Sequence, residues 1–188
     1  VDEFERRGLR IIGPRREAAK LESSKAFAKD FMARHGVPTA RYATADSETS
    51  AILELESGSF GGRDTPLVIK ADGLAAGKGV VVARNRAEAV DAINGMSSLV
   101  GSAAADKIVI EECLVGPEVS LLAFVDGENY ALMPPTRDHK RIGDGDTGPN
   151  TGGMGTITDA SLLSTEQLVE IEETIIRPTL SGCVSEDL

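Results

Sequence analysis

The chain has 188 residues, of which 41% are hydrophobic and 27% are charged, and both values are close to those of globular domains. A chain of this length can bury a core without disulfides or metal ions, as one domain or as two small ones. The formal net charge is −10, and Lys and Arg are spread along the chain rather than gathered in a stripe. These features exclude a disordered chain and argue against nucleic acid as a partner.

Cysteine usage and the lengths of the apolar runs bear on the compartment. Cys113 and Cys183 show neither CxxC nor Cys/His spacing, so they predict no zinc site and no disulfide framework. The longest apolar runs are about five residues, far below the roughly 20 that are needed to span a bilayer. We therefore expect a cytoplasmic protein with no membrane partner. Because the chain begins with Val1 inside a predicted helix, we interpret it as part of a longer protein.

Helices and strands are predicted in mixed order along the first half of the chain. A helix over 17–34 carries apolar residues at helical spacing, and Ser23 or Ser24 divides it by capping a second helix. Gly36 and Pro38 end that helix. The other expected elements are helices at 1–8, 46–56 and 86–96 and strands at 9–12, 39–44, 66–71 and 79–83.

The second half is predicted to contain strands, one long loop and a closing helix. Residues 134–155 are rich in glycine and proline and show neither periodicity, so they predict a long functional loop. Ser164 caps an amphipathic helix over 164–180. Strands are expected at 108–112, 118–125 and 130–133, the last two as a hairpin around Asp126-Gly127. Mixed element order with a hairpin favours the α+β class over a doubly wound sheet.

The stretch 66–80 is the first pointer to chemistry, because a strand delivers Lys70 to a loop of small residues. Such a loop lets backbone N–H groups approach phosphate oxygens closely. It is not a P-loop, since that motif requires Ser or Thr where Gly79 stands. A lone loop of this kind is equally compatible with an ordinary hairpin turn that carries a solvated lysine.

Four ordered segments make the interpretation more specific. VIKADGLAAGKGVVVA resembles the nucleotide lid of the glycinamide ribonucleotide synthetases (phosphoribosylamine–glycine ligases), which belong to the ATP-grasp superfamily. GPRREAAKLESSKAFAKDFMARHGVPTA, VIEECLVGPEVSLLAFVDG and MPPTRDHKRIGDGDTGPNTGGMG match the same family in order, and together the four segments span residues 13–155. The resemblance implies an ATP-grasp fold in which two lobes clamp ATP.

The resemblance also implies an activity. Members of this family are carbon–nitrogen ligases of purine biosynthesis that join 5-phosphoribosylamine and glycine to glycinamide ribonucleotide through a glycyl phosphate, while ATP becomes ADP and phosphate. The resemblance also divides the chain into three parts. These are the end of an amino-terminal lobe (1–14), a small lobe with the lid (41–112), and part of a larger lobe with the substrate loop (15–40 and 113–188). Phosphoribosylamine, glycine and ATP are the expected small-molecule partners.

Nucleotide-binding residues follow from the same resemblance. Lys25 and Lys70 resemble the lysines that reach the phosphates, with Lys70 also catalytic, and each supplies a compact positive charge. Glu111 is expected to accept from the adenine amino group, and Glu118 from the ribose hydroxyls. Gly73, Gly77, Lys78 and Gly79 match the lid, and Glu112 and Leu114 match the linker between the lobes. An exposed loop-tip lysine remains the alternative for Lys78, and a solvated strand-end carboxylate for Glu118.

The substrate end is expected in the Gly-rich segment. Basic side chains beside a Gly-rich backbone suit a sugar phosphate and an amino-acid carboxylate, since both anions accept several N–H groups. The predicted substrate-binding residues are Asp138, His139, Lys140, Arg141, Asn150, Thr151, Gly152 and Gly153, with Lys140 and Arg141 also catalytic. His139 is interpreted as a hydrogen-bonding scaffold in preference to a general base.

Two departures from the family pattern qualify the prediction. Cys113 stands where the family often has an aromatic or large apolar residue, so one wall of the adenine pocket is unassigned. The strand that holds Mg²⁺ (or Mn²⁺) in the family is expected beyond Leu188, so no metal ligand is predicted within the chain, and the isolated chain is expected to be poorly active. The alternatives are another ATP-grasp ligase or carboxylase, or a non-catalytic nucleotide-binding module.

Overall fold

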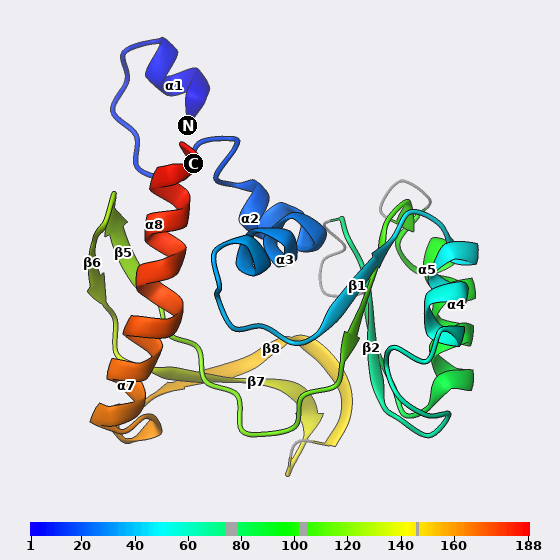
Figure 1. Ribbon diagram of the computed structural model, residues 1–188. Coiled ribbons are helices and arrows are strands. Elements are labelled where there is room, and N and C mark those ends of the chain that lie inside the picture. Colours follow the sequence, from blue (N-terminus) through cyan, green and yellow to red (C-terminus); the bar gives the residue numbers. More distant parts are fainter. Residues whose placement is uncertain (74–78, 102–104, 146) are drawn as a thin grey trace. The chain divides into compact units, whose positions relative to one another are not determined.

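The fold was analysed in a computed structural model that describes residues 1–73, 79–101, 105–145 and 147–188. The chain separates into two compact units (Figure 1). Unit 1 comprises residues 1–34 and 39–114 together with Leu188, and unit 2 comprises residues 35–38 and 115–187. Each unit is described by itself.

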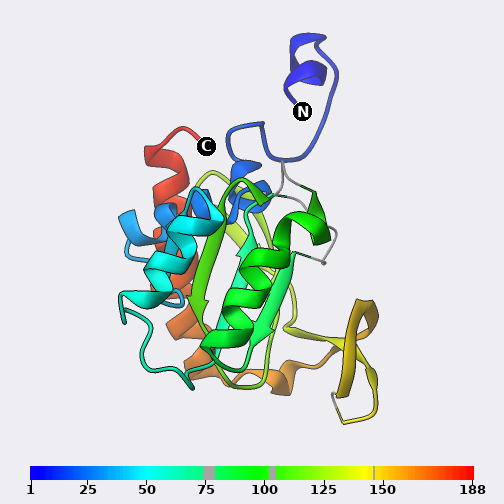
Figure 2. The ribbon, with the colours of Figure 1, turned by 90° about the vertical axis from the view of Figure 1, so that its right-hand side faces the viewer.

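Unit 1 is built on a four-stranded antiparallel sheet. Its strands are β1 (Tyr42–Ala45), β2 (Leu67–Ala71), β3 (Val80–Ala83) and β4 (Ile108–Glu112), in the order β1-β4-β2-β3. Its helices are α1 (Asp2–Arg6), α2 (Lys20–Ser23), α3 (Lys25–Arg34), α4 (Glu48–Glu56) and α5 (Arg86–Val100). The helices α4 and α5 cover one face of the sheet, and α3 lies on the other face (Figures 1 and 2).

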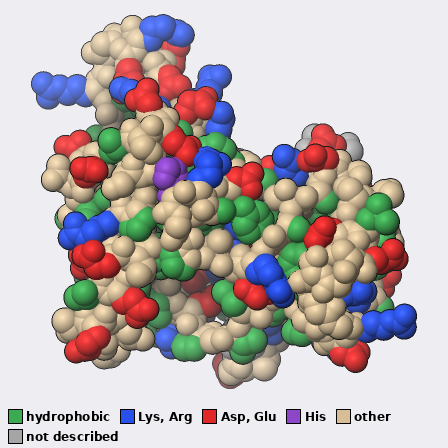
Figure 3. Space-filling view, in the orientation of Figure 1, with side chains coloured by type: hydrophobic (Ala, Val, Ile, Leu, Met, Phe, Trp, Pro, Cys, Tyr) green, Lys and Arg blue, Asp and Glu red, His purple; other side chains and the backbone are tan. Residues whose placement is uncertain are grey.

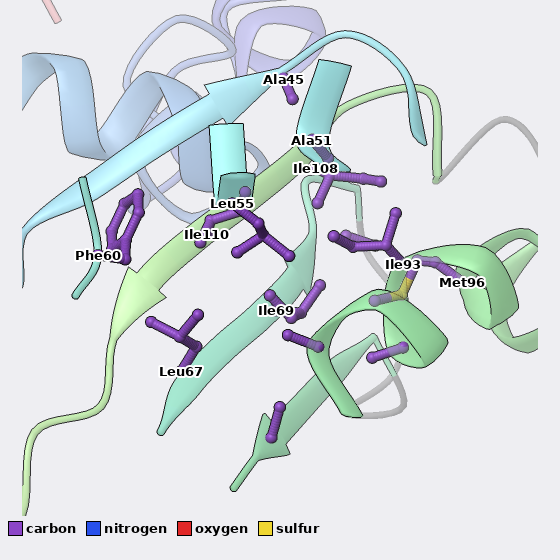
Figure 4. Packing of buried hydrophobic residues seen from close by; sticks show 14 of the residues in the cluster. Ala45, Ala51, Leu55, Phe60, Leu67, Ile69, Ile93, Met96, Ile108 and Ile110 are labelled. Carbon is purple, nitrogen blue, oxygen red and sulfur yellow. The ribbon is translucent and has the colours of Figure 1, made fainter. Parts of the chain in front are cut away.

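The hydrophobic core of unit 1 lies between the sheet and the pair α4 and α5. On β2 and β4 alternate residues face this core, because successive side chains of a strand point to opposite faces. Ile69 of β2 lies opposite Ile110 of β4, and both are fully buried. Figure 4 shows them packed with Leu55 of α4 and Ile93 of α5. The other members of strands β2 and β4 therefore face α3.

Unit 2 contains two hairpins and a long helical segment. Its strands are β5 (Ala123–Asp126), β6 (Asn129–Leu132), β7 (Thr136–Gly143) and β8 (Thr147–Thr158), which pair as β5-β6 and β7-β8. The helical segment runs through η1 (Ala160–Leu162), α7 (Thr165–Ile171), η2 (Glu172–Ile176) and α8 (Arg177–Ser185). The π-helical turn η2 ends two residues before Pro178, whose missing N–H interrupts the regular ladder.

Several sequence predictions agree with these elements. The long first helix is divided at Ser24, whose hydroxyl accepts a hydrogen bond from the Phe27 N–H. The hairpin turns at Asp126-Gly127-Glu128-Asn129, although its first strand begins only at Ala123. The final helix starts with a capping box between Ser164 and Gln167. The mixed sheet and helix content confirms the α+β class.

Two predictions were wrong. Residues 9–12 form no strand, and Ile12 is fully exposed, because no strand in the described part of the chain pairs with this segment. Residues 134–155 are not a loop: most of them form the ribbon β7-β8. The ribbon shows no alternation of apolar and polar residues because most of its side chains on either face are exposed, so no face selects for apolar residues.

The predicted lobes and the two compact units differ at residues 1–34, 39–40 and 113–114 and at Leu188, all of which belong to unit 1. Residues 15–40 were predicted to pack with 113–188, whereas residues up to Arg34 group with unit 1. The cause is a set of hydrogen bonds between the start of α3 and Asp72, described below. The assignment of the two clamp lobes itself stays a prediction.

The surface charges, the lengths of the helices and the cysteines agree with an ordinary globular chain in the described residues. On the face shown in Figure 3, basic and acidic side chains are interspersed rather than separated into stripes. Across the described ranges, no helix is long and apolar enough to cross a membrane. Both cysteines are free thiols, and burial raises the pKa of the Cys183 thiol.

Candidate functional site: lysines on one face of the sheet

The first cluster lies between β2, β4 and α3. Lys70 of β2 donates a hydrogen bond to Glu111 of β4, with 2.9 Å between Nζ and Oε2. Lys29 of α3 approaches the same oxygen at 3.2 Å and donates to Thr39 Oγ1 at 2.7 Å. The side chains of Lys29 and Glu111 are 9% and 6% exposed, whereas that of Lys70 is 25% exposed. Of these three charged groups, only Lys70 reaches toward solvent.

The second cluster joins the start of α3 to the end of β2. The Asp72 carboxylate accepts hydrogen bonds from the Ser24 hydroxyl at 3.0 Å and from the Ala26 N–H at 2.7 Å. The Lys25 ammonium group donates to the carbonyl of Gly73 at 3.2 Å and lies 3.4 Å from that of Asp72. Lys25 is therefore held where the predicted lid begins.

Helix and strand spacings explain why the two clusters form together. Lys25 and Lys29 are four residues apart and share a face of α3, a rise of about 6 Å along the helix. Lys70 lies in β2 and Asp72 directly follows the last residue of that strand, Ala71. In extended backbone, residues two positions apart lie on one face, with a rise of about 6.6 Å. The two spacings nearly match, so one helix face can engage both strand positions at once.

Replacing Asp72 by alanine is expected to lower the free energy of unfolding by about 1–2 kcal/mol, because α3 loses its acceptors for the Ser24 hydroxyl and the Ala26 N–H. Urea unfolding followed by circular dichroism measures the loss. Asp64→Ala is the matched control, since that aspartate is exposed in a loop. Equal stability of the two variants would contradict the tie between helix and strand.

The predicted linker follows β4 directly. Glu112 and Arg41 are joined twice: the Glu112 N–H donates to the Arg41 carbonyl at 3.0 Å, and the Arg41 N–H donates to Glu112 Oε1 at 2.8 Å. The Glu112 side chain is thus engaged with the backbone. Leu114 is 70% exposed and Cys113 is half-buried. Main-chain groups of this segment remain the proposed readers of an adenine ring.

The lid itself is described only at its ends. Gly79 is buried, and its carbonyl accepts a hydrogen bond from the Ala71 N–H at 2.8 Å. This bond joins the two chain segments where the lid leaves the strands β2 and β3. Gly73 binds Lys25 through its carbonyl. The predicted lid residues Gly77 and Lys78 lie outside the described residues.

The predicted substrate residues lie in unit 2, on the ribbon β7-β8. Asp138 and Lys140 form an ion pair of 3.5 Å on β7, with His139 exposed between them. The Thr151 hydroxyl donates to the Lys140 carbonyl at 2.8 Å and accepts from the Gly153 N–H at 3.1 Å. Arg141 and Gly152 are exposed, and the backbone of Arg141 pairs with that of Asn150. The ribbon therefore gathers the predicted set from two strands.

Glu118 also lies in unit 2 and is exposed. Its carbonyl accepts a hydrogen bond from the Arg137 side chain at 3.0 Å, which ties the segment before β5 to the base of the ribbon. This places the predicted ribose carboxylate in the same unit as the predicted substrate residues.

Sequence reasoning missed Lys29, Asp72 and Ser24's contact with Asp72. A signal for Lys29 was present, because it lies four residues after Lys25 and so on the same helix face. Asp72 lies two residues after Lys70, which places both on one face of an extended segment. The sequence could not show which residues these side chains contact. Ser24 and Asp72 are 48 positions apart, and Lys29 and Glu111 are still further apart.

The side chains of the two clusters fit the groups that an ATP-grasp fold implies. Glu111 Oε1 is buried and has no hydrogen-bond partner in the described part of the chain, so it can accept an N–H such as that of an adenine amino group. Lys25 and Lys70 supply ammonium groups for phosphate. These residues fit a nucleotide. The described residues contain no group of three or more His, Cys, Asp or Glu side chains that could hold a metal ion.

The fold defines the class of protein. The biotin carboxylase of Campylobacter jejuni superposes with a TM-score of 0.75 at 20% identity, over 97% of this chain and 39% of that chain. At this identity the likeness shows the fold alone, which is the ATP-grasp fold.

The family follows from closer similarity. The model of the phosphoribosylglycinamide synthetase ATP-grasp (A) domain matches residues 23–188, and the chain belongs to that family. It is 48% identical to the phosphoribosylamine–glycine ligase of Xanthomonas axonopodis pv. citri, over 99% of this chain and 42% of that protein. The crystal structure of the Thermotoga maritima phosphoribosylamine–glycine ligase gives a TM-score of 0.78 at 37% identity, over 93% and 43% of the chains. The chain thus spans less than half the length of these relatives.

Proposed function

We propose that this chain is the ATP-binding part of an enzyme that joins 5-phosphoribosylamine and glycine to glycinamide ribonucleotide in the cytoplasm. The observation that carries the proposal is the pair of lysines in unit 1 of a chain of this family: Lys25 is held by the Gly73 carbonyl and Lys70 by the Glu111 carboxylate. Two ammonium groups beside the start of one lid segment suit the phosphates of a nucleotide.

In the proposed reaction, a glycine carboxylate oxygen attacks the terminal phosphorus of ATP and ADP leaves. The amine of phosphoribosylamine then attacks the glycyl carbonyl carbon, and phosphate leaves with the former carboxylate oxygen. Lys70 would hold the transferred phosphoryl group, because it is the one ammonium of its cluster with access to solvent. Magnesium would neutralise further charge on that group.

The ribbon β7-β8 is proposed to bind the two acceptor substrates. Lys140 and Arg141 present cationic side chains beside the exposed glycines of β8, and this combination suits a sugar phosphate and a carboxylate. The Thr151 hydroxyl fixes the local backbone by bridging the two strands. Glu118 is proposed to accept from the ribose hydroxyls of the nucleotide.

The experiment that tests the function is a coupled assay of the full-length protein that carries this chain. With magnesium and ATP, we expect phosphate release and glycinamide ribonucleotide formation only when phosphoribosylamine and glycine are both present. Reactions that omit each substrate in turn are the controls, and D-alanine or bicarbonate replaces glycine to test other ATP-grasp chemistry. Phosphate release that follows one of those acids instead of glycine would overturn the proposal.

A further inference from the structure

Lys29 is a buried charged residue that the proposed function does not use. Its ammonium group contacts Glu111 Oε2 at 3.2 Å, Thr39 Oγ1 at 2.7 Å and the Ala40 carbonyl at 3.4 Å. The side chain is only 9% exposed, so it cannot reach a bound nucleotide without leaving these partners. Lys29 can therefore act on a bound nucleotide only through another residue.

The residue that Lys29 can act on is Glu111, as the balance of charges around its carboxylate indicates. Glu111 Oε2 receives two ammonium groups, whereas one would neutralise the carboxylate. A buried carboxylate that loses its only cationic partner is strongly disfavoured, because the interior solvates an isolated charge poorly. With Lys29 in place, Lys70 can depart and Glu111 keeps a partner.

We propose that Lys29 is a positioning residue that releases Lys70 to the nucleotide: it neutralises Glu111 permanently, so that Lys70 exchanges the carboxylate for a phosphate group. This inference rests on the proposed role of Lys70 in phosphate binding. Lys70 suits the exchange because its side chain is 25% exposed, against 9% for Lys29.

Charged and titratable neighbours surround the Glu111 carboxylate on several elements. In the described part of the chain it pairs with Lys29 from α3 and Lys70 from β2, and its backbone pairs with that of Tyr42 from β1. The Lys29 ammonium lies 5.6 Å from the centre of the Tyr42 ring. Burial and the Asp30 carboxylate raise the pKa of the Tyr42 hydroxyl, which therefore stays neutral near pH 8.

The first test is ATP binding to Lys29→Met in the full-length protein, measured by calorimetry on protein whose folding is checked by circular dichroism. Glycine and phosphoribosylamine are left out, so the result does not depend on ligation. We expect the affinity for ATP to fall about tenfold or more at pH 8, because Lys70 is then the only ammonium partner of Glu111 among the described residues. Unchanged affinity would overturn the proposal.

The double variant Lys29→Met/Glu111→Gln distinguishes positioning from a loss of structure. Because Glu111 is also the proposed acceptor for the adenine amino group, the double variant is compared with the single variant Glu111→Gln. Without the carboxylate there is nothing for Lys29 to neutralise, so adding Lys29→Met is expected to change the affinity for ATP by less than about twofold. A merely structural role of Lys29 predicts that Lys29→Met lowers the affinity as much in the Glu111→Gln background as in the wild type, and that outcome would contradict the proposal.

If Lys29→Met does not fold, the wild-type protein still decides the question. A crystal structure with a non-hydrolysable ATP analogue is expected to show Lys29 still paired with Glu111 and Lys70 on a phosphate oxygen. A structure in which Lys70 remains on Glu111, or Lys29 leaves it, would refute the inference. A failure of the ligation assay with these results intact would instead refute only the proposed reaction.

Discussion

Lys70→Ala is expected to weaken ATP binding roughly ten- to a hundredfold, because one charge-assisted contact to phosphate contributes about 1.5–3 kcal/mol. The fold is expected to survive, since Glu111 keeps Lys29 as its partner at 3.2 Å. Calorimetric titration of the full-length protein with ATP measures the change in affinity.

The control for this prediction is Lys107→Ala in the same unit. The Lys107 side chain is 44% exposed, and its ammonium pairs only loosely with exposed Asp46, at 3.5 Å. Exposed ion pairs of this kind contribute little, so binding of ATP is expected to be unchanged. If Lys70→Ala binds ATP as tightly as this control, Lys70 does not contact the phosphates.

Ile69→Ala is expected to lower the free energy of unfolding by about 2–5 kcal/mol, which is a large part of the stability of an ordinary domain. Ile69 is fully buried in the central strand β2, with Val81 and Ile110 as its neighbours across the sheet. Truncation leaves a cavity between the sheet and the helices α4 and α5, because close-packed interiors collapse only partly around a deleted side chain. Urea unfolding measures the loss.

Ile12→Ala provides the same substitution at a fully exposed position of unit 1. Its effect is expected to lie within about 0.5 kcal/mol of zero, as for most surface changes. A similar loss in both variants would mean that the sheet and helices do not form the core described here.

Elements whose signals are local could be predicted from the sequence. The runs 108–110 and 67–69 are apolar and rich in β-branched residues, so both were recognised as strands. Ser164 with Gln167 marks the start of the last helix because a capping box acts within one turn. Local chemistry was sufficient in each case.

Elements whose stability comes from a distant partner could not be predicted in the same way. The segment 9–12 has β-branched residues but gains no strand, because a strand exists only when another strand pairs with it. The ribbon β7-β8 shows the reverse: main-chain pairing forms it without any apolar alternation. Propensity describes one segment, whereas pairing is a property of two.

In the candidate site, too, residues in local motifs could be predicted, whereas contacts between distant residues could not. The family motifs point to Lys25 and Lys70, but the sequence alone does not reveal that Glu111 binds two lysines. A lysine on an amphipathic helix normally lies in solvent, so Lys29 gave no reason to expect burial. Its burial depends on a carboxylate supplied by a strand far along the chain.

The matched spacing of α3 and β2 places a limit on how this stretch can change. One extra residue between Lys25 and Lys29 would turn the later side chains by about 100° around the helix. One extra residue between Lys70 and Asp72 would send one of them to the opposite face of the sheet. Homologous sequences are therefore expected to keep the length of both stretches, so that alignment gaps fall outside them.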